Sequence, residues 1–183
     1  MGSLAGPVVV CAIGVTNTFY KKHHRKLRRL RESKLLLPHQ REEFAKELLN
    51  EKGIVYALSR CYPRKIDQIN IYQAAREAMR RSLKKIEPNI KVKTMVLVDG
   101  RNKIQGIKHD QQAIIKGDRK VFAIACASII AKVHRDWMME RYAKKYPNYG
   151  FEKHKGYGTR QHRTQLSILG PSAIHRYSFR LAY

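Results

Sequence analysis

Acidic residues are scarce in this sequence. Its 183 residues include 38 Lys and Arg but only 14 Asp and Glu, which gives a formal net charge of +24 at pH 7. So large an excess of positive charge disfavours a cationic partner and favours a polyanion, and nucleic acid is the first candidate. A surface that is basic only for solvation is the simpler alternative, and an anionic membrane is a poorer one.

Cysteine is scarce too, and the sequence has no long apolar run. The three cysteines, Cys11, Cys61 and Cys126, are odd in number and far apart, so they indicate neither a disulfide framework nor a zinc site. No stretch reaches the roughly 20 apolar residues that a membrane-spanning helix needs, and the apolar run at 8–15 lacks the flanks of a signal peptide. We expect a cytoplasmic protein with reduced thiols and no membrane contact, and we expect it to be a monomer.

Strand and helix patterns alternate along the chain. Apolar and β-branched runs predict strands at 7–15, 54–59, 94–99 and 112–115, and periodic apolar positions predict helices at 38–52, 66–87, 121–140 and 160–169. Such alternation is typical of an α/β layer fold. With 43% hydrophobic residues the chain suits a single domain over 1–183, whose C-terminal portion from about 138 is helical.

Several side chains have an expected place in these helices. Asp67 or Asn70 is expected to cap the helix that begins near 66. Trp137, Met138 and Met139 are expected to make core contacts from the long helix.

Two aspartates suggest chemistry. Asp99 ends the strand predicted at 94–99, and Asp136 lies late in the long helix. Carboxylate oxygens bind hard divalent cations, and a pair of such ions can clamp both sides of a phosphodiester. The simpler alternatives are a turn cap for Asp99 and an ion pair with a neighbouring base such as Arg135 for Asp136. Glu140, one turn beyond Asp136, is expected to be a solvated carboxylate.

Two segments are strongly basic. The block 20–34, which includes His23, is expected to face phosphates or solvent. The loop at 153–159 presents Tyr157 between two glycines and beside Lys155, which favours contact of that tyrosine with nucleic acid over ordinary packing. Three histidines in and beyond this loop are expected to donate to phosphate or to pack, without a catalytic role: His154, His162 and His175.

Six short motifs, taken in order, closely resemble ribonuclease HII. They are Leu-Ala-Gly-Pro-Val-Val at 4–9, Val-Asp-Gly at 98–100, Ile-Lys-Gly-Asp at 115–118, Ala-Lys-Val-His-Arg-Asp at 131–136, Tyr-Gly-Phe-Glu-Lys-His-Lys-Gly-Tyr-Gly-Thr at 149–159, and Gly-Pro-Ser-Ala-Ile-His-Arg at 170–176. Each motif alone is a weak signal, but their order and number are specific, and the resemblance runs from about residue 2 to about Phe179.

The resemblance implies a fold, an activity and a metal. The fold would be RNase H-like, with a central mixed sheet flanked by helices. The activity would be endonucleolytic cleavage of the RNA strand of RNA/DNA hybrids and of ribonucleotides embedded in duplex DNA, with Mg²⁺ or Mn²⁺. Asp99 and Asp136 match two of the four family carboxylates, so the resemblance makes them catalytic residues and metal ligands.

The resemblance also implies four substrate-binding residues. Lys155 and Tyr157 match the family's basic loop, whose tyrosine stacks at the junction of ribose and deoxyribose. Lys34 matches a phosphate-contacting lysine, although Glu32 stands before Ser33 where the family usually has Asp. Gly2 matches the last glycine of a Gly-Arg-Gly turn.

One part of the family pattern has no counterpart here. In the family an Asp-Glu pair and the Gly-Arg-Gly turn lie ahead of the motif at 4–9, on the first and central strand. We therefore expect the domain to be N-terminally incomplete, with that strand and two carboxylates missing. A truncated enzyme and a decayed relative that binds RNA/DNA hybrids without cleaving them both fit, and a basic ribosome- or nucleoid-associated protein is a third hypothesis.

Overall fold

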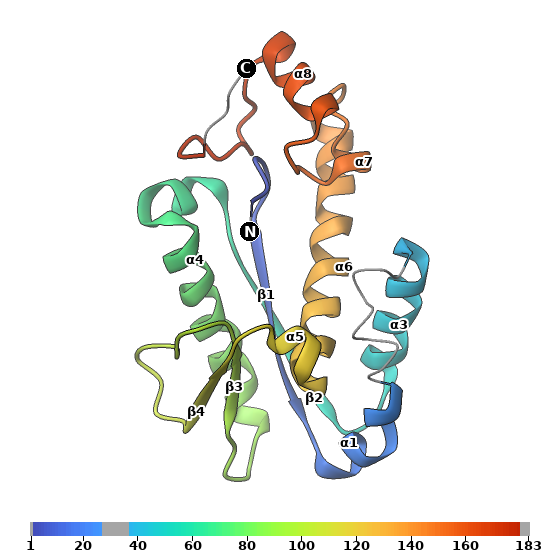
Figure 1. Ribbon diagram of the computed structural model, residues 1–183, viewed down its shortest axis with the longest axis vertical. Coiled ribbons are helices and arrows are strands. Elements are labelled where there is room, and N and C mark those ends of the chain that lie inside the picture. The colour runs from blue at the N-terminus through green and yellow to red at the C-terminus, as the bar shows by residue number, and fades with distance from the viewer. Residues whose placement is uncertain (1, 27–36, 180–183) are drawn as a thin grey trace. The chain divides into compact units, whose positions relative to one another are not determined.

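The computed structural model describes residues 2–26 and 37–179 (Figure 1). The chain divides into two compact units. Unit 1 consists of Met1–Val9, Arg60–Ala78 and His134–Tyr183, and unit 2 consists of Val10–Ser59 and Met79–Val133. The single domain expected over 1–183 stays a prediction. Lys34 lies outside the described residues.

Helices and strands alternate along the chain, which confirms the α/β class. Their order is β1 (Val8–Val15), α1 (Asn17–His23), η1 (His24–Lys26), α3 (Pro38–Asn50), β2 (Ile54–Cys61), α4 (Pro63–Ile86), η2 (Glu87–Asn89), β3 (Val96–Asp99), β4 (Gln111–Ile114), α5 (Gly117–Lys120), α6 (Phe122–Lys145), α7 (Phe151–His154) and α8 (Arg160–Leu169). All predicted strands and helices are present, most with shifted ends. None of the helices in the described ranges is long and apolar enough to cross a bilayer.

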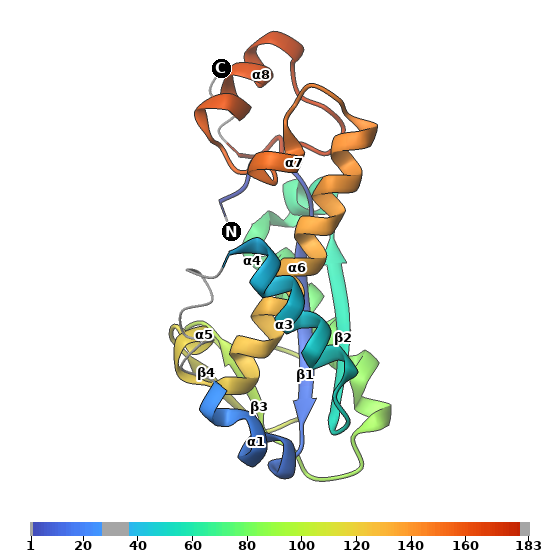
Figure 2. The ribbon, with the colours of Figure 1, turned by 90° about the vertical axis from the view of Figure 1, so that its right-hand side faces the viewer.

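The strands of the described residues form two two-stranded sheets in place of one continuous sheet. In one, β1 pairs with β2, and the two strands run in opposite directions (Figure 2). In the other, β3 and β4 are parallel, with the register running from Val96 opposite Gln111 to Asp99 opposite Ile114. Asp99 is therefore the last paired residue of its strand, as the sequence predicts.

The core of unit 2 lies where α6 meets α1 and α3. Phe19 and Leu48 pack there with Phe122, whose ring centroid is 5.9 Å from that of Phe19. Small side chains on α6, Ala125 and Cys126, are 1% and 0% exposed and allow close packing. Burial raises the pKa of the Cys126 thiol to about 12, so this cysteine stays a neutral core residue.

The core of unit 1 is aromatic. Tyr149 and Phe151 stack with ring centroids 5.2 Å apart and planes inclined by 3°. Ala5, Met139 and Ile174 complete the cluster. The short segment around Ala5 enters this core through β-bridges, which pair Ser3 with Tyr157 and Ala5 with His175.

The start of α4 differs from the expectation. The helix begins at Pro63, a residue suited to a first turn because its missing N–H needs no partner there. Asn70 interrupts it with φ 62° and ψ 162°, and its Oδ1 accepts from the backbone N–H groups of Tyr72 and Gln73 at 3.0 Å. Asn70 is thus confirmed as a cap. Asp67 is not one, since its carboxylate accepts from the backbone near Ser178 instead.

The prediction for Trp137 is wrong. Met138 and Met139 are 7% and 0% exposed, as expected, but Trp137 is 50% exposed. It lies on the other side of α6, where the Arg141 guanidinium carbon is 4.9 Å from its ring centroid. The helix has more apolar residues than its buried face can hold.

The two basic segments are partly helical. α7 takes up the start of the expected loop at 153–159. Part of the basic block 20–34 belongs to α1, in which His23 is 6% exposed. His23 therefore faces neither phosphate nor solvent, because it stacks on Phe19 with ring centroids 4.5 Å apart.

Candidate active site and substrate-binding surface

Asp99 projects from the end of β3 and is exposed. Its Oδ1 accepts a hydrogen bond of 2.8 Å from the backbone N–H of Gly117, the first residue of α5. A Cβ at Gly117 would lie 2.6 Å from the Ile124 Cδ1 atom and 3.3 Å from Asp99 Oδ1, so a larger residue would force the Ile124 side chain to shift. Asp99 is a turn cap, and since a carboxylate offers about four acceptor sites, it keeps the capacity to bind a cation.

Asp136 lies on α6 and is half-buried. It follows the buried Arg135 and shares a helix face with Glu140, one turn further on. Asp136 therefore stands where α6 passes the loop that carries Lys155, in unit 1.

Arg135 holds this part of unit 1 together. It is 8% exposed, and four hydrogen bonds of 3.0–3.1 Å run from its guanidinium to the Pro7, Ala5 and Lys155 carbonyls and to the Ser3 hydroxyl. Burial lowers the pKa of Arg135, whereas the nearby Tyr157 and Asp136 act in the opposite sense. A buried guanidinium needs such complete pairing, so it fixes the segment 3–7 against the loop.

Tyr157 is presented by a tightly packed loop. The backbone N–H of Leu4 donates to the carbonyl of Gly156 at 2.8 Å, next to the bridge between Ser3 and Tyr157. Gly156 has φ +80°, and a Cβ there would lie 2.6 Å from the Ala5 carbonyl oxygen, so only glycine fits. The Tyr157 side chain is 44% exposed, with the Arg135 guanidinium carbon 5.4 Å from its ring centroid. A base could stack on such a ring.

Lys155 is already engaged within the protein. Its Nζ donates to Glu140 Oε1 at 2.6 Å and to the Glu152 carbonyl at 2.7 Å, and its side chain is 18% exposed. The Glu140 side chain is 48% exposed, as expected of a solvated carboxylate, and it also pairs with Lys155. The spacing of Glu140 from Asp136 predicts that both lie on the same helix face. Spacing alone does not predict that the loop carrying Lys155 meets this face.

Three buried histidines support the loop from inside. His162 Nδ1 is 2.9 Å from the Tyr157 carbonyl, and His162 Nε2 is 3.0 Å from His175 Nε2. The Ser172 backbone N–H donates to His175 Nδ1, which makes that nitrogen an acceptor. The Gly156 N–H donates likewise to His154 Nδ1, and His154 Nε2 lies 2.7 Å from the Tyr149 carbonyl.

These hydrogen bonds are consistent with a neutral imidazole ring at each of the three histidines. His154 donates through Nε2, His175 donates through Nε2 to His162, and His162 donates through Nδ1 to Tyr157. Burial lowers the pKa of all three, and that of His162 to about 4. They pack and position the loop, which confirms the packing alternative.

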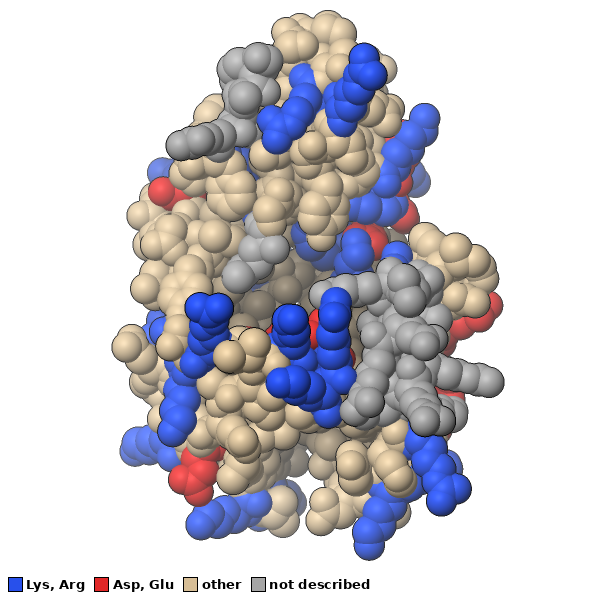
Figure 3. Space-filling view, viewed as in Figure 1, with Lys and Arg blue, Asp and Glu red and all other residues tan. Residues whose placement is uncertain are grey.

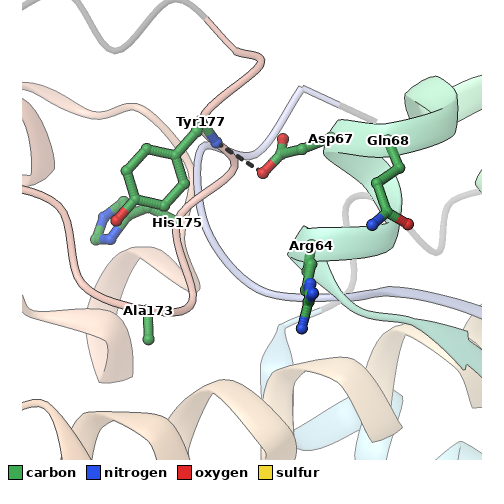
Figure 4. Close-up of a pocket in the computed structure, with 6 residues that line it drawn as sticks. All are labelled: Arg64, Asp67, Gln68, Ala173, His175 and Tyr177. Carbon is green, nitrogen blue, oxygen red and sulfur yellow. Dashed lines mark hydrogen bonds between the residues drawn. The ribbon is translucent and has the colours of Figure 1, made fainter.

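Unit 1 also contains a pocket that the sequence does not predict. Figure 4 shows its lining, and its volume is about 450 Å³. Asp67 Oδ2 accepts from the Tyr177 backbone N–H at 3.1 Å beside it. The residues around the pocket are Arg64, Asp67, Gln68, Ala173, His175 and Tyr177. None of the predicted site residues is among them.

The predicted site residues that the structure describes fall into two groups. Unit 1 holds Asp136, Lys155 and Tyr157 within one hydrogen-bonded assembly, with the exposed Gly2 next to Ser3 at its edge. Asp99 belongs to unit 2. Figure 3 shows one face of the molecule, on which Lys and Arg side chains far outnumber Asp and Glu, as a polyanion partner requires.

Comparison with known proteins agrees with the order of the motifs. The family model described as Ribonuclease HII matches residues 1–182. A ribonuclease HII of Caldicellulosiruptor bescii is 45% identical over 180 residues, which cover 97% of this chain and 81% of that protein. A ribonuclease HII of Chlorobium phaeobacteroides is 39% identical over 180 residues, which cover 98% of this chain and 85% of that protein.

Solved structures are similar over the same length. Ribonuclease H2 from Pyrococcus horikoshii matches with a TM-score of 0.76 at 24% identity, over 99% of this chain and 90% of that one. A chain of the PCNA:RNase HII complex from Archaeoglobus fulgidus matches with a TM-score of 0.75 at 24% identity, over 100% and 90%. These likenesses show the fold, which confirms the RNase H-like expectation. The sequence relatives show more: this chain belongs to the ribonuclease HII family.

Proposed function

We propose that this chain is a metal-dependent endonuclease that hydrolyses the RNA strand of RNA/DNA hybrids and ribonucleotides embedded in duplex DNA. Its membership of the family supports the reaction class. The observation that carries the proposal is the assembly around Arg135, which joins the helix turn of Asp136 to the loop of Lys155 and Tyr157. A carboxylate and a residue proposed to contact nucleic acid would thereby belong to one hydrogen-bonded structure.

Asp99 and Asp136 would hold Mg²⁺ or Mn²⁺. Both carry the hard oxygen donors that such ions prefer, and Asp99 is exposed with one oxygen fixed by the Gly117 N–H. When bound, the ions would supply an activated water and charge stabilisation at the phosphate. The chain's own part is to fix the direction of each carboxylate, through α5 for Asp99 and through α6 for Asp136.

Tyr157, Lys155, Gly2 and Lys34 would bind the substrate. The exposed face of Tyr157 suits stacking on a sugar or base, and its fixed backbone limits where that contact falls. Lys155 would move from Glu140 to a phosphate oxygen, an exchange of one anionic partner for another. Gly2 would approach the backbone of the substrate closely, because it has no side chain and a Cβ there would meet open space.

We also propose a cytoplasmic monomer. The free thiols of Cys11, Cys61 and Cys126 support a reducing compartment. Monomeric behaviour stays a prediction that gel filtration would check.

Cleavage of a labelled duplex that contains one ribonucleotide tests the proposal. A protein that also carries the family's first strand with its Asp-Glu pair should cut it in Mg²⁺ or Mn²⁺ and not in EDTA. Asp99→Asn and Asp136→Asn should each slow cleavage by about 100-fold or more, because an ion contributes several kcal/mol to the transition state. Asp110→Asn is the matched control, since Asp110 is an exposed carboxylate 3.9 Å from Lys93.

The same experiment separates the alternative function. Tight binding of the duplex in EDTA, together with no cleavage in either metal, would favour a binding protein without chemistry. Normal cleavage by both Asp variants would refute the site assignment.

A further inference from the structure

A group of potential metal ligands lies in unit 2, where the family resemblance assigns none. His23, Glu47 and Glu51 each offer one ligand atom, and these atoms all lie within 4.8 Å of one another. His23 ends α1, Glu47 lies in the last turn of α3, and Glu51 follows that helix directly. The three residues therefore converge from two helix ends.

The Nε2 atom of the histidine in this group is buried without a hydrogen-bond partner among the described residues. His23 is 6% exposed, and its Nε2 atom has no hydrogen-bond partner in the described part of the chain. The Nε2 atom faces Glu51 Oε1 at 3.4 Å, but the geometry is not that of a hydrogen bond. A buried polar atom within ion-pair distance of a carboxylate but without a hydrogen bond is costly, so this nitrogen is suited to binding a ligand.

The two carboxylates lie close together at the end of a helix. Glu47 and Glu51 are one helical turn apart, so their like charges repel. Both lie at the C-terminal end of α3, where the helix dipole disfavours negative charge. Lys22 offers weak compensation, since its Nζ is 3.9 Å from Glu51 Oε2 and its side chain is 70% exposed.

The backbone that carries the three ligands is held firmly. The Thr16 N–H donates to the Gly53 carbonyl at 3.2 Å, which ties the start of α1 to the chain after α3. Phe19, one turn before His23, packs in the core with Ala45 and Leu48 of α3. Ligand atoms about 2.1 Å from a tetrahedral ion lie about 3.4 Å apart, so only small side-chain rotations separate the present arrangement from a bound one.

We propose that His23, Glu47 and Glu51 form a binding site for a divalent transition-metal ion of the zinc class, with water completing its coordination. An imidazole nitrogen with two carboxylates suits Zn²⁺, whereas Mg²⁺ prefers a shell made of oxygen alone. The ion would give the buried nitrogen its partner and neutralise the two carboxylates. Its effect would be to fasten the end of α1 to the end of α3.

Calorimetric titration of metal-free protein with Zn²⁺ tests the site. The full chain carrying Asp99→Asn and Asp136→Asn is used, so that ions at the proposed catalytic carboxylates do not contribute. One equivalent should bind, and Glu47→Gln and Glu51→Gln should each weaken it at least tenfold. His23→Gln should weaken it about 100-fold, and Glu43→Gln, an exposed carboxylate one turn earlier on α3, should change nothing.

Cobalt supplies a second readout. Co²⁺ should give visible bands of nitrogen and oxygen ligation that disappear in Glu51→Gln, and no thiolate charge-transfer band. Undiminished Zn²⁺ affinity in Glu47→Gln and Glu51→Gln, the absence of a bound equivalent, or a thiolate band would each overturn the proposal. Cleavage is not measured, so the result is independent of the proposed nuclease function.

Discussion

Histidines are buried in both units, but under opposite conditions. In unit 1 the rings of His154, His162 and His175 use their nitrogens in hydrogen bonds that run to the Tyr157 loop. In unit 2 the buried Nε2 of His23 has no such partner among the described residues and faces a carboxylate instead. Burial alone thus does not tell a packing histidine from a candidate ligand, whereas the hydrogen-bond pattern does.

The largest expected effect is the loss of stability in unit 1 when Arg135 is removed. Arg135→Ala leaves three carbonyls and the Ser3 hydroxyl without their donor, and it should lower the free energy of unfolding by about 3–5 kcal/mol. Urea unfolding measures the loss. Arg141→Ala, on the exposed face of the same helix, should cost about 1 kcal/mol or less. Equal losses of free energy of unfolding in the two variants would show that the hydrogen bonds of Arg135 do not stabilise unit 1.

Acid should loosen the same region. Burial lowers the pKa of His162 to about 4, whereas the ordinary value of 6.5 applies to the unfolded chain. Between these values the unfolded chain binds a proton that the folded chain does not, so stability is full above about pH 6.5 and falls as pH decreases toward 4. Urea unfolding across this range measures the slope, which His162→Gln should reduce and His39→Gln should not.

A substitution at Gly156 should have a smaller effect on stability, confined to the loop that carries Tyr157. Gly156→Ala adds a Cβ at φ +80° and 2.6 Å from the Ala5 carbonyl, so it should cost about 2–3 kcal/mol and displace Tyr157. Gly170→Ala is the matched control, because Gly170 also has positive φ, +68°, but a Cβ there meets nothing within 4 Å. The control should cost about 1 kcal/mol, and equal losses would mean that the contact with Ala5 is not tight.

The smallest expected effect comes from releasing Lys155. Glu140→Gln removes the carboxylate 2.6 Å from Lys155 Nζ, so hybrid binding should tighten several-fold and its salt dependence should steepen by about one phosphate contact. Glu152→Gln removes the same charge nearby, although Lys155 contacts only the Glu152 carbonyl. An equal gain in both variants would indicate general charge rather than this pair.

The sequence predicts the elements of the fold well and the contacts within the site only in part. Local signals suffice for β1, α6 and α8, because apolar periodicity and the glycine and proline breaks are encoded within each segment. Asp99 could be placed for the same reason, as the last residue of an apolar run. The role of Arg135 could not, since the Pro7 carbonyl that it binds lies 128 residues away.

The predictions for Trp137 and His23 are wrong for the same reason, because the burial of each residue depends on contacts with distant parts of the chain. Trp137 and Met138 are neighbours on an apolar stretch, and only the tertiary packing of α6 decides which of them is exposed. His23 belongs to a basic block in the sequence, which predicts exposure, whereas its burial depends on packing against Phe19 and α3. Asp136, Lys155 and Tyr157 stay predicted site residues, now with a defined structural setting in unit 1.

The most direct test of this account is the cleavage rate of Tyr157→Ala on a duplex with a single ribonucleotide, in Mg²⁺. Loss of one stacking contact of about 1–3 kcal/mol should slow cleavage roughly 5- to 150-fold, while the free energy of unfolding changes little because the ring is 44% exposed. A Tyr157→Ala variant that cleaves this duplex as fast as the unaltered chain would contradict the account.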